Sequence, residues 1–199
     1  VLYHTSGPVF GEIEMTIDWI AAGGRKDFSE TRTYRFFAGE DTSIIDQRNV
    51  FNFTEGDTMF ANTKEGGICA LRIASSMDEA KNGDNPGKGH MTNSTGKSDA
   101  KNIWGKAAAW CDYFGPVAGE TVGIAVFDAP TNFRHPTRWH IRDYGLYTAN
   151  PFGAGNFTDG KEDGTHVYKK GEIATFNYRV LIHKGDTAQA KIGSAYAVF

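Results

Sequence analysis

Two stretches of strict alternation limit what this chain can fold into. From Gly11 to Ile20, and again over Glu172–His183, apolar side chains take every second position and polar ones mostly fill the positions between. A period of two is typical of a β-strand with one buried face and does not fit a helix. In the first stretch the face predicted to be buried carries Ile13, Met15, Ile17 and Trp19.

Further runs of apolar, β-branched and aromatic residues, bounded by turn-forming residues, predict more strands. These are Thr31–Ala38, Thr42–Thr54, Gly67–Ala74, Ala107–Phe114, Thr121–Asp128, Thr137–Arg142, Gly145–Ala149 and Ala195–Phe199. The pattern shows no helix and no internal repeat. With 199 residues, 14 of them Phe and 8 Tyr, the chain suits one domain. We expect an all-β fold, an antiparallel β-sandwich with less than about 15% helix.

One long segment interrupts this pattern of strands. Ser75–Ile103 is rich in Gly, Asn, Asp, Ser and Lys and has no hydrophobic period. We interpret it as a long polar loop, either a mobile excursion or an active-site lid. It is predicted to be the most mobile internal segment, because it lacks apolar anchors.

The charge argues against nucleic acid as a partner, and the hydropathy argues against a transmembrane helix. The net charge is -3 and the pI about 6.1, with no basic stripe, so nucleic acid is not an expected partner. No apolar run approaches the roughly 20 residues of a transmembrane helix. The two cysteines, Cys69 and Cys111, lack metal-ligand spacing; we expect buried thiols, with a single disulfide as the alternative.

The densest group of ionisable residues lies between Asp128 and Gly145. In the strand predicted at Thr137–Arg142, the side chains of Arg138, His140 and Arg142 share one face. Such a face requires carboxylates, water or a polar ligand. We therefore predict His140 as an acid/base, with Asp128 or Glu65 as its partner. The predicted substrate-binding residues from this segment are Arg134, His135, Arg138, Arg142 and Tyr144. The alternative is an ion-pair network that only fixes loops.

Two other segments place charged residues beside aromatic ones or beside each other. Lys64 precedes Glu65 at a strand entry, where an acid and a base could meet a ligand, although a solvated turn is the alternative. The second segment combines Trp and Tyr with Asp, a composition typical of sugar-binding clefts; the alternative places the tryptophans in the core. Its candidate substrate-binding residues are Trp104, Trp110, Asp112 and Tyr113.

Metal ligation has only a weak signal. His135 and His140 are candidate ligands, but their H-x4-H spacing matches none of the strong zinc patterns. No phosphate loop or dinucleotide fingerprint is present. We predict no cofactor and keep a divalent metal as an alternative.

Several motifs carry a family resemblance. Asn62–Gly66, Trp104–Tyr113, Gly123–Asp128, Arg134–Leu146 and Ala149–Gly153 resemble the methane-oxygenase-A-like (PmoA-like) bacterial family. The resemblance implies a fold similar to the galactose-mutarotase-like supersandwich, which handles sugars on a concave sheet face. Members are longer at the N-terminus, so it also implies that this chain is the C-terminal part of the family domain. It favours a periplasmic or other extracytoplasmic location.

These observations favour a carbohydrate-active protein that binds or acts on a sugar or glycoside, as an enzyme of hydrolase, lyase or epimerase type. The alternatives are a non-catalytic carbohydrate-binding domain and a structural domain with an ion-pair cluster. Replacing His140 by Ala is expected to cost the fold little stability. We expect one concave surface, with Trp104 or Tyr113 at its rim. The residues predicted to converge there are Lys64, Glu65, Asp128, Arg134, His135, His140 and Arg142.

Overall fold

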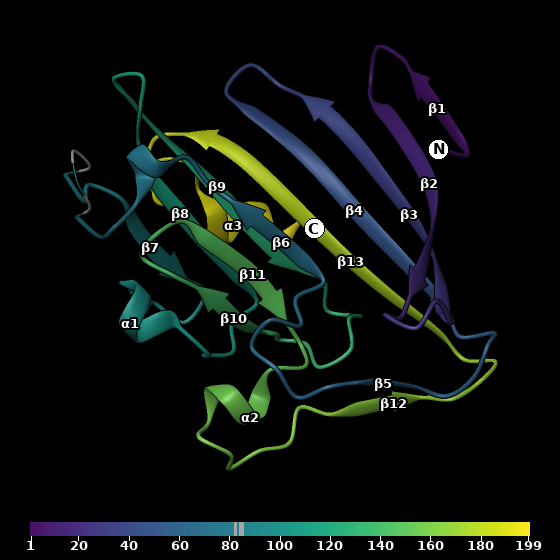
Figure 1. Ribbon diagram of the computed structural model, residues 1–199. Helices are drawn as coiled ribbons and strands as arrows, with labels where there is room; N and C mark the ends of the chain where they lie inside the picture. The colour runs from purple at the N-terminus through teal and green to yellow at the C-terminus, as the bar shows by residue number, and fades with distance from the viewer. Residues whose placement is uncertain (82, 84–85) are drawn as a thin grey trace.

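The chain folds into layers of antiparallel strands, shown in Figure 1 by a computed structural model that describes residues 1–81, 83 and 86–199. Strand makes up 47% and helix 9%, which confirms the all-β class. The largest layer is an eight-stranded sheet. Its strands, in spatial order, are β1 (Tyr3–Ser6), β2 (Gly11–Ile20), β3 (Lys26–Ala38), β4 (Thr42–Asn52), β13 (Ile173–Lys184), β9 (Glu120–Asp128), β8 (Trp110–Val117) and β7 (His90–Asn93).

A smaller sheet forms the second layer over one part of the large sheet. It consists of β10 (Arg138–Ile141), β11 (Leu146–Asn150) and β6 (Cys69–Arg72). Trp139 and Tyr147 pack in one core cluster with Tyr178 of β13. In Figure 1 this small sheet lies over β8 and β9, whereas β2 and β3 lie to one side of it. β5 (Thr58–Phe60) and β12 (His166–Tyr168) pair separately at the lower edge.

The two alternating stretches form the strands β2 and β13, but they are not buried alike. In β13, Phe176, Tyr178 and Val180 are buried as the alternation predicts. In β2 the predicted burial is wrong: Ile13, Met15 and Ile17 are only half-buried and Trp19 is 43% exposed, whereas Glu12 of the opposite face is only 5% exposed. The side of β2 that carries Trp19 stays open, because the small sheet does not extend over β2. Glu12, on the other side, is covered by its contacts with Tyr3 and Arg35.

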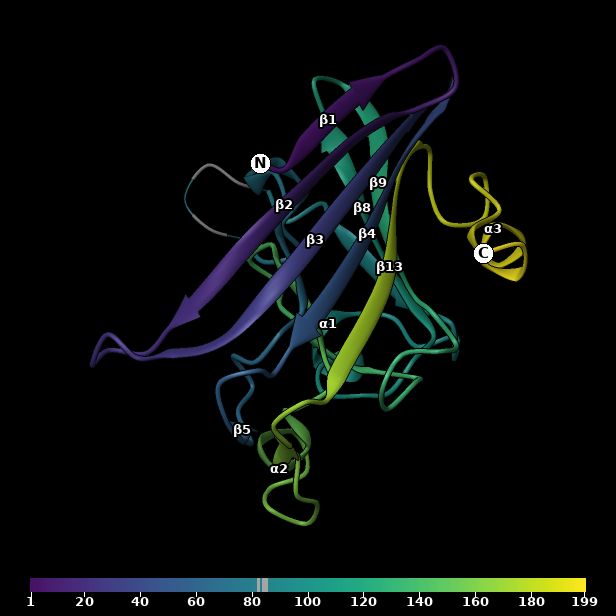
Figure 2. The ribbon, with the colours of Figure 1, turned by 90° about the vertical axis from the view of Figure 1, so that its right-hand side faces the viewer.

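The C-terminal strand predicted at Ala195–Phe199 is wrong, because α3 (Ile192–Ala197) occupies this position. Figure 2 shows β1, β2, β3, β4 and β13 side by side in this order, with α3 beyond β13. Four residues of the segment pack against the outer side of β9 and β13: Ile192, Ala195, Tyr196 and Phe199. Their spacing of three, four and seven residues is that of a helix face, which a search for period two misses.

The segment Ser75–Ile103 contains regular structure, contrary to the loop predicted from its composition. It includes a 3-10 turn (Ser75–Met77), strand β7 and helix α1 (Ala100–Ile103). Met77, Met91 and Ile103 are buried and anchor it to the core. Single anchors at such wide spacing leave no period in the sequence. Residues 82, 84 and 85 of this segment lie outside the described part, and its mobility stays a prediction.

Both cysteines are buried free thiols, as predicted. The described residues form no helix that is long and apolar enough to cross a membrane. The remaining helix, α2 (Ala154–Phe157), lies in the connection between β11 and β12 and helps to position the site described below.

Candidate functional site

The small sheet divides the predicted cluster into separate groups. In β10, Trp139 and Ile141 point into the core, so Arg138 and His140 face the opposite side. Asp128 shares its side of β9 with the core residue Val126. Asp128 and His140 therefore lie on opposite sides of β10, and the predicted convergence on one surface is wrong for Asp128.

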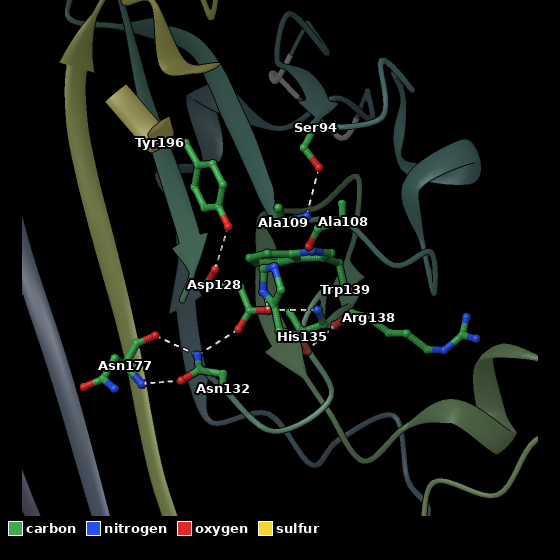
Figure 3. A network of polar contacts seen from close by, with 11 residues as sticks. Ser94, Ala108, Ala109, Asp128, Asn132, His135, Arg138, Trp139, Asn177 and Tyr196 are labelled. Atoms are coloured by element: carbon green, nitrogen blue, oxygen red, sulfur yellow. Dashed lines mark hydrogen bonds and ion pairs between the residues drawn. The ribbon is translucent and has the colours of Figure 1, made fainter. Parts of the chain in front are cut away.

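Asp128 is the centre of a buried network, drawn in Figure 3. One carboxylate oxygen accepts a hydrogen bond from Asn132 Nδ2 at 2.8 Å, and the other accepts one from the Thr137 backbone N–H at 2.8 Å and contacts His135 Nδ1 at 2.8 Å. Burial raises the pKa of Asp128, while these hydrogen bonds act in the opposite direction. Asn132 continues the network to the backbone of Asn177 in β13. The network fixes the loop between β9 and β10, which is the structural interpretation of these residues.

Arg134 and Arg138 also hold loops together. The Arg134 guanidinium donates to the carbonyl oxygens of Pro151 and Gly164, at 2.9 and 2.6 Å. Arg138 binds both carboxylate oxygens of Glu162 through Nη2, at 2.7 and 2.9 Å. Both arginines thus fasten the connection between β11 and β12 instead of extending into an open cleft.

Asp112 pairs with a histidine that the sequence analysis did not single out. Its carboxylate contacts His183 Nε2 at 3.0 Å and accepts a hydrogen bond from Thr187 Oγ1 at 2.5 Å. His183 is only 2% exposed. Burial by itself lowers the pKa of His183, but the hydrogen bond and charge of Asp112 outweigh it, and the pKa is raised. This pair ties the C-terminal segment to the outer side of the large sheet.

The remaining aromatic candidates do not form one stacking surface. Trp110 packs beside α3, whereas Tyr113 points to the other side of β8 and is fully buried in the core. Tyr144 is exposed, and the guanidinium carbons of Arg72 and Arg142 each lie 5.4 Å from its ring centroid. Of these three rings, only Tyr144 lies next to the group of predicted site residues described below, because its ring contacts Arg142.

That group is centred on His140, which is 3% exposed. His140 Nδ1 lies 2.9 Å from the carbonyl oxygen of Lys64. Because a carbonyl can only accept, Nδ1 carries the proton and Nε2 of the neutral ring presents a lone pair. Nε2 is buried and has no hydrogen-bond partner in the part of the chain that the structure describes. Burial lowers the pKa of His140, and the bond to Lys64 opposes this shift.

Trp104 provides a second nitrogen of the same kind beside His140. The two ring centroids are 6.3 Å apart, and Phe157 of α2 packs against both rings. The indole Nε1 is buried and, among the described residues, has no acceptor. Leaving a buried polar group unsatisfied costs about 1–3 kcal/mol, so two such atoms together indicate a place for a polar molecule.

An open pocket of about 260 Å³ lies next to Trp104, with Arg142 also among its lining residues. Lys101 and Asp143 add a charge of each sign to the wall. The exposed pair of Lys64 and Glu65 has an Nζ–Oε1 distance of 3.8 Å. We refer to His140, Trp104, Lys64, Glu65 and Arg142 together as the His140 site.

Comparison with known families assigns nearly the whole chain to one family. Residues 1–197 match the sequence model of a family of unknown function (DUF6807). The chain belongs to this family. A search of curated proteins finds no match. Membership of DUF6807 names no chemistry, so the function has to be argued from the site itself.

In this member of DUF6807, three asparagines that sequence reasoning missed hold the loop carrying Lys64. Asn150 Nδ2 donates to the carbonyl oxygens of Thr63 and Lys64, at 2.9 and 2.7 Å. Asn156 Oδ1 accepts from the Lys64 N–H at 2.7 Å, and Asn62 Oδ1 accepts from a backbone N–H of α2 at 2.8 Å. A side-chain amide can replace a backbone partner in this way. The run Asn150-Pro151-Phe152-Gly153 was the available signal, since Asn next to Pro and Gly marks turns.

The structure separates the two histidines that were weak metal candidates. His135 Nδ1 is bound to Asp128, and His140 Nδ1 is bound to a backbone carbonyl on the other side of β10. Within residues 1–81, 83 and 86–199, no three His, Cys, Asp or Glu side chains are grouped to hold a metal ion. The two histidines therefore do not form the shared metal site considered from their spacing.

Proposed function

We propose that this domain is carbohydrate-active and binds a sugar or glycoside at the His140 site. The observation that carries the proposal is the pair of buried ring nitrogens, Trp104 Nε1 and His140 Nε2, without partners in the described part of the chain. One is a hydrogen-bond donor and the other an acceptor. The ligand must therefore offer both an acceptor and a donor.

A sugar hydroxyl meets this requirement, because a single O–H group both donates and accepts. A carboxylate or phosphate oxygen accepts from the indole but gives nothing to His140 Nε2. An ammonium group donates to His140 but gives nothing to the indole. The Trp104 ring offers an apolar surface for sugar C–H groups, and Arg142 supplies donors in the same pocket. Lys64 and Glu65, whose loop contacts His140, supply a further donor and an acceptor.

Proton transfer by His140 is the enzymatic form of this proposal. The lowered pKa keeps the ring neutral at neutral pH, and the Lys64 carbonyl fixes which nitrogen is free. A neutral, oriented imidazole next to a bound hydroxyl has the properties of a general base. A non-catalytic binding domain remains the second candidate, favoured by the exposed position of Glu65, the only carboxylate of the group.

Two conservative variants test the proposal. His140→Asn keeps a side-chain N–H for the Lys64 carbonyl and removes Nε2, and Trp104→Phe keeps an aromatic ring and removes Nε1. Binding of D-galactose, D-glucose, D-xylose and their methyl β-glycosides is measured by calorimetry. We expect at least one sugar to bind and each variant to weaken it by about tenfold, equivalent to about 1.4 kcal/mol.

His135→Asn is the matched control, because it makes the same substitution in the Asp128 network on the other side of β10. It should leave sugar affinity unchanged. Failure of every sugar in the panel, or an equal loss in the control, would show that the proposal is wrong. Turnover of a bound glycoside by the wild type but not by His140→Asn would distinguish an enzyme from a binding domain.

A further inference from the structure

A second concavity lies on the inner side of β2 and β3, away from the His140 pocket. It is a groove of about 340 Å³ between the large sheet and the segment that runs from β5 to β6. We propose that this groove, called the Trp19 groove, binds a pyranose ring of a neutral oligosaccharide. Six of its lining residues carry the argument: Trp19, Asp27, Phe28, Arg32, Met59 and Glu65.

A fully buried carboxylate, Glu30, holds two of the residues that line the groove. Glu30 has no exposed surface, yet its two oxygens receive four hydrogen bonds. Arg32 donates from Nε and Nη2 at 2.6 and 2.9 Å, Trp19 from Nε1 at 2.9 Å, and Asn49 from Nδ2 at 2.6 Å. A buried ion pair contributes little net stability compared with apolar packing. Its clear effect here is to hold Trp19 and Arg32 in fixed positions.

The hydrogen bonds of Glu30 continue through Asn49 to the opposite wall of the groove. Gln47 Nε2 donates to Asn49 Oδ1 at 2.8 Å and lies 3.3 Å from the carbonyl oxygen of Ile68. Ile68 lines the far side of the groove. The width of the groove is thus set by a continuous chain of hydrogen bonds from Glu30 to Ile68, so a ligand meets a preformed site.

Trp19 presents an aromatic surface without a free polar atom. Phe28 stacks on the indole, with ring centroids 5.4 Å apart and an interplanar angle of 16°, and 43% of Trp19 stays exposed. Its only N–H is taken by Glu30. Such a ring binds C–H surfaces by stacking and does not select by hydrogen bonding.

The polar atoms around this ring complete a surface suited to a sugar. A guanidinium has five N–H donors, and Glu30 receives those of two nitrogens, so donors remain on the 24% of the Arg32 side chain that is exposed. Asp27 and Glu65 provide acceptors along the same groove. Donors and acceptors beside an apolar platform fit the hydroxyls and the C–H face of one pyranose ring. Glu65 is shared with the His140 site, whereas Trp19, Asp27, Phe28, Arg32 and Met59 belong to the groove alone and carry the proposal without His140 or Trp104.

The test uses full-length chain carrying His140→Asn and Trp104→Phe, so that the His140 site cannot contribute. Cellohexaose, xylohexaose, laminarihexaose and mannohexaose are titrated by calorimetry. At least one should bind, and adding Trp19→Ala should weaken it by about tenfold or more. Adding Met59→Ala, which shortens an exposed side chain on the other wall, should weaken it by a few-fold.

Met59→Ala also protects the test against a folding defect, because it leaves all four hydrogen bonds of Glu30 in place. Circular dichroism and thermal melts check each variant. If no hexasaccharide binds, or if both additional variants bind as tightly as the background chain, the groove is not a sugar site. A Trp19-dependent complex with a peptide in place of the sugars would equally overturn the proposal.

Discussion

The two buried histidines of this domain differ at a single nitrogen. His140 Nδ1 lies 2.9 Å from the Lys64 carbonyl, and His183 Nδ1 lies 3.2 Å from the Lys184 carbonyl. At Nε2, His183 meets the Asp112 carboxylate at 3.0 Å, whereas His140 meets no partner among the described residues. A buried histidine with both nitrogens bonded serves the fold; one with a bare nitrogen is available to a ligand.

The same difference reverses the electrostatics of the two rings. Burial acts on both and disfavours the charged form. At His183 the Asp112 carboxylate overcomes burial, and the pKa is raised. At His140 burial prevails, and the pKa is lowered. His183 is thus suited to a stable ion pair, and His140 to remaining neutral and accepting a hydrogen bond from a ligand.

The largest expected effect comes from breaking the saturated site. Asp112→Ala leaves the buried His183 Nε2 and the Thr187 hydroxyl without their partner, and each lost hydrogen bond to the carboxylate typically costs about 1.5–3 kcal/mol of unfolding free energy. Urea denaturation measures the loss. Glu162→Ala, which breaks the exposed pair with Arg138, is the control and should cost at most about 1 kcal/mol. Equal losses in the two variants would contradict a structural role for the Asp112–His183 pair.

A smaller loss is expected at His140. The sequence suggested that His140→Ala costs little stability, but the ring is 3% exposed and packs against Trp104 and Phe157. We expect His140→Ala to cost about 1–3 kcal/mol, because it leaves space beside these rings and removes one of the two side-chain hydrogen bonds to the Lys64 carbonyl. Urea denaturation should place it below Asp112→Ala. A loss larger than that of Asp112→Ala would make His140 primarily structural.

The pH dependence should separate the two rings by sign. Because the folded pKa of His140 is lowered, the unfolded chain takes up the proton more readily, and stability falls as pH drops below about 6.5. The raised pKa of His183 gives stability that is complete below about 6.5 and is lost as pH rises through the folded pKa.

These signs are read from unfolding free energies of wild type, His140→Asn and His183→Asn between pH 5 and 8. The advantage of wild type over His140→Asn should grow with pH, and its advantage over His183→Asn should shrink. Parallel changes in both comparisons would refute the assigned environments.

The sequence predicted the long strands better than the short elements. Gly11–Ile20 forms β2 with the predicted bounds, because ten residues of alternation specify a strand without tertiary help. β1, β5 and β12 have only three or four residues each and owe their pairing to neighbours in space. In Ala195–Phe199 the apolar residues suited either period, and packing against β9 decided for α3.

For the site, parity identified the shared face of Arg138 and His140, but not which elements cover that face. The predicted neighbours Lys64 and Trp104 do lie beside His140. Asp128 does not, because its strand faces the core side of β10, which local sequence does not reveal. The Asp112–His183 pair joins residues 71 positions apart, and such long-range contacts have no local signal.

The most direct test of the account follows the side-chain nitrogens of both histidines by ¹⁵N NMR during titration with the sugar that binds best in the calorimetric panel. Before addition, His140 should show a neutral ring protonated at Nδ1. On addition, the His140 Nε2 resonance should move as it accepts a hydroxyl proton in a hydrogen bond, while both His183 resonances stay in place. A saturating sugar that leaves His140 Nε2 unchanged, or that moves His183 equally, would contradict the claim that the bare nitrogen of His140 is the ligand-binding atom.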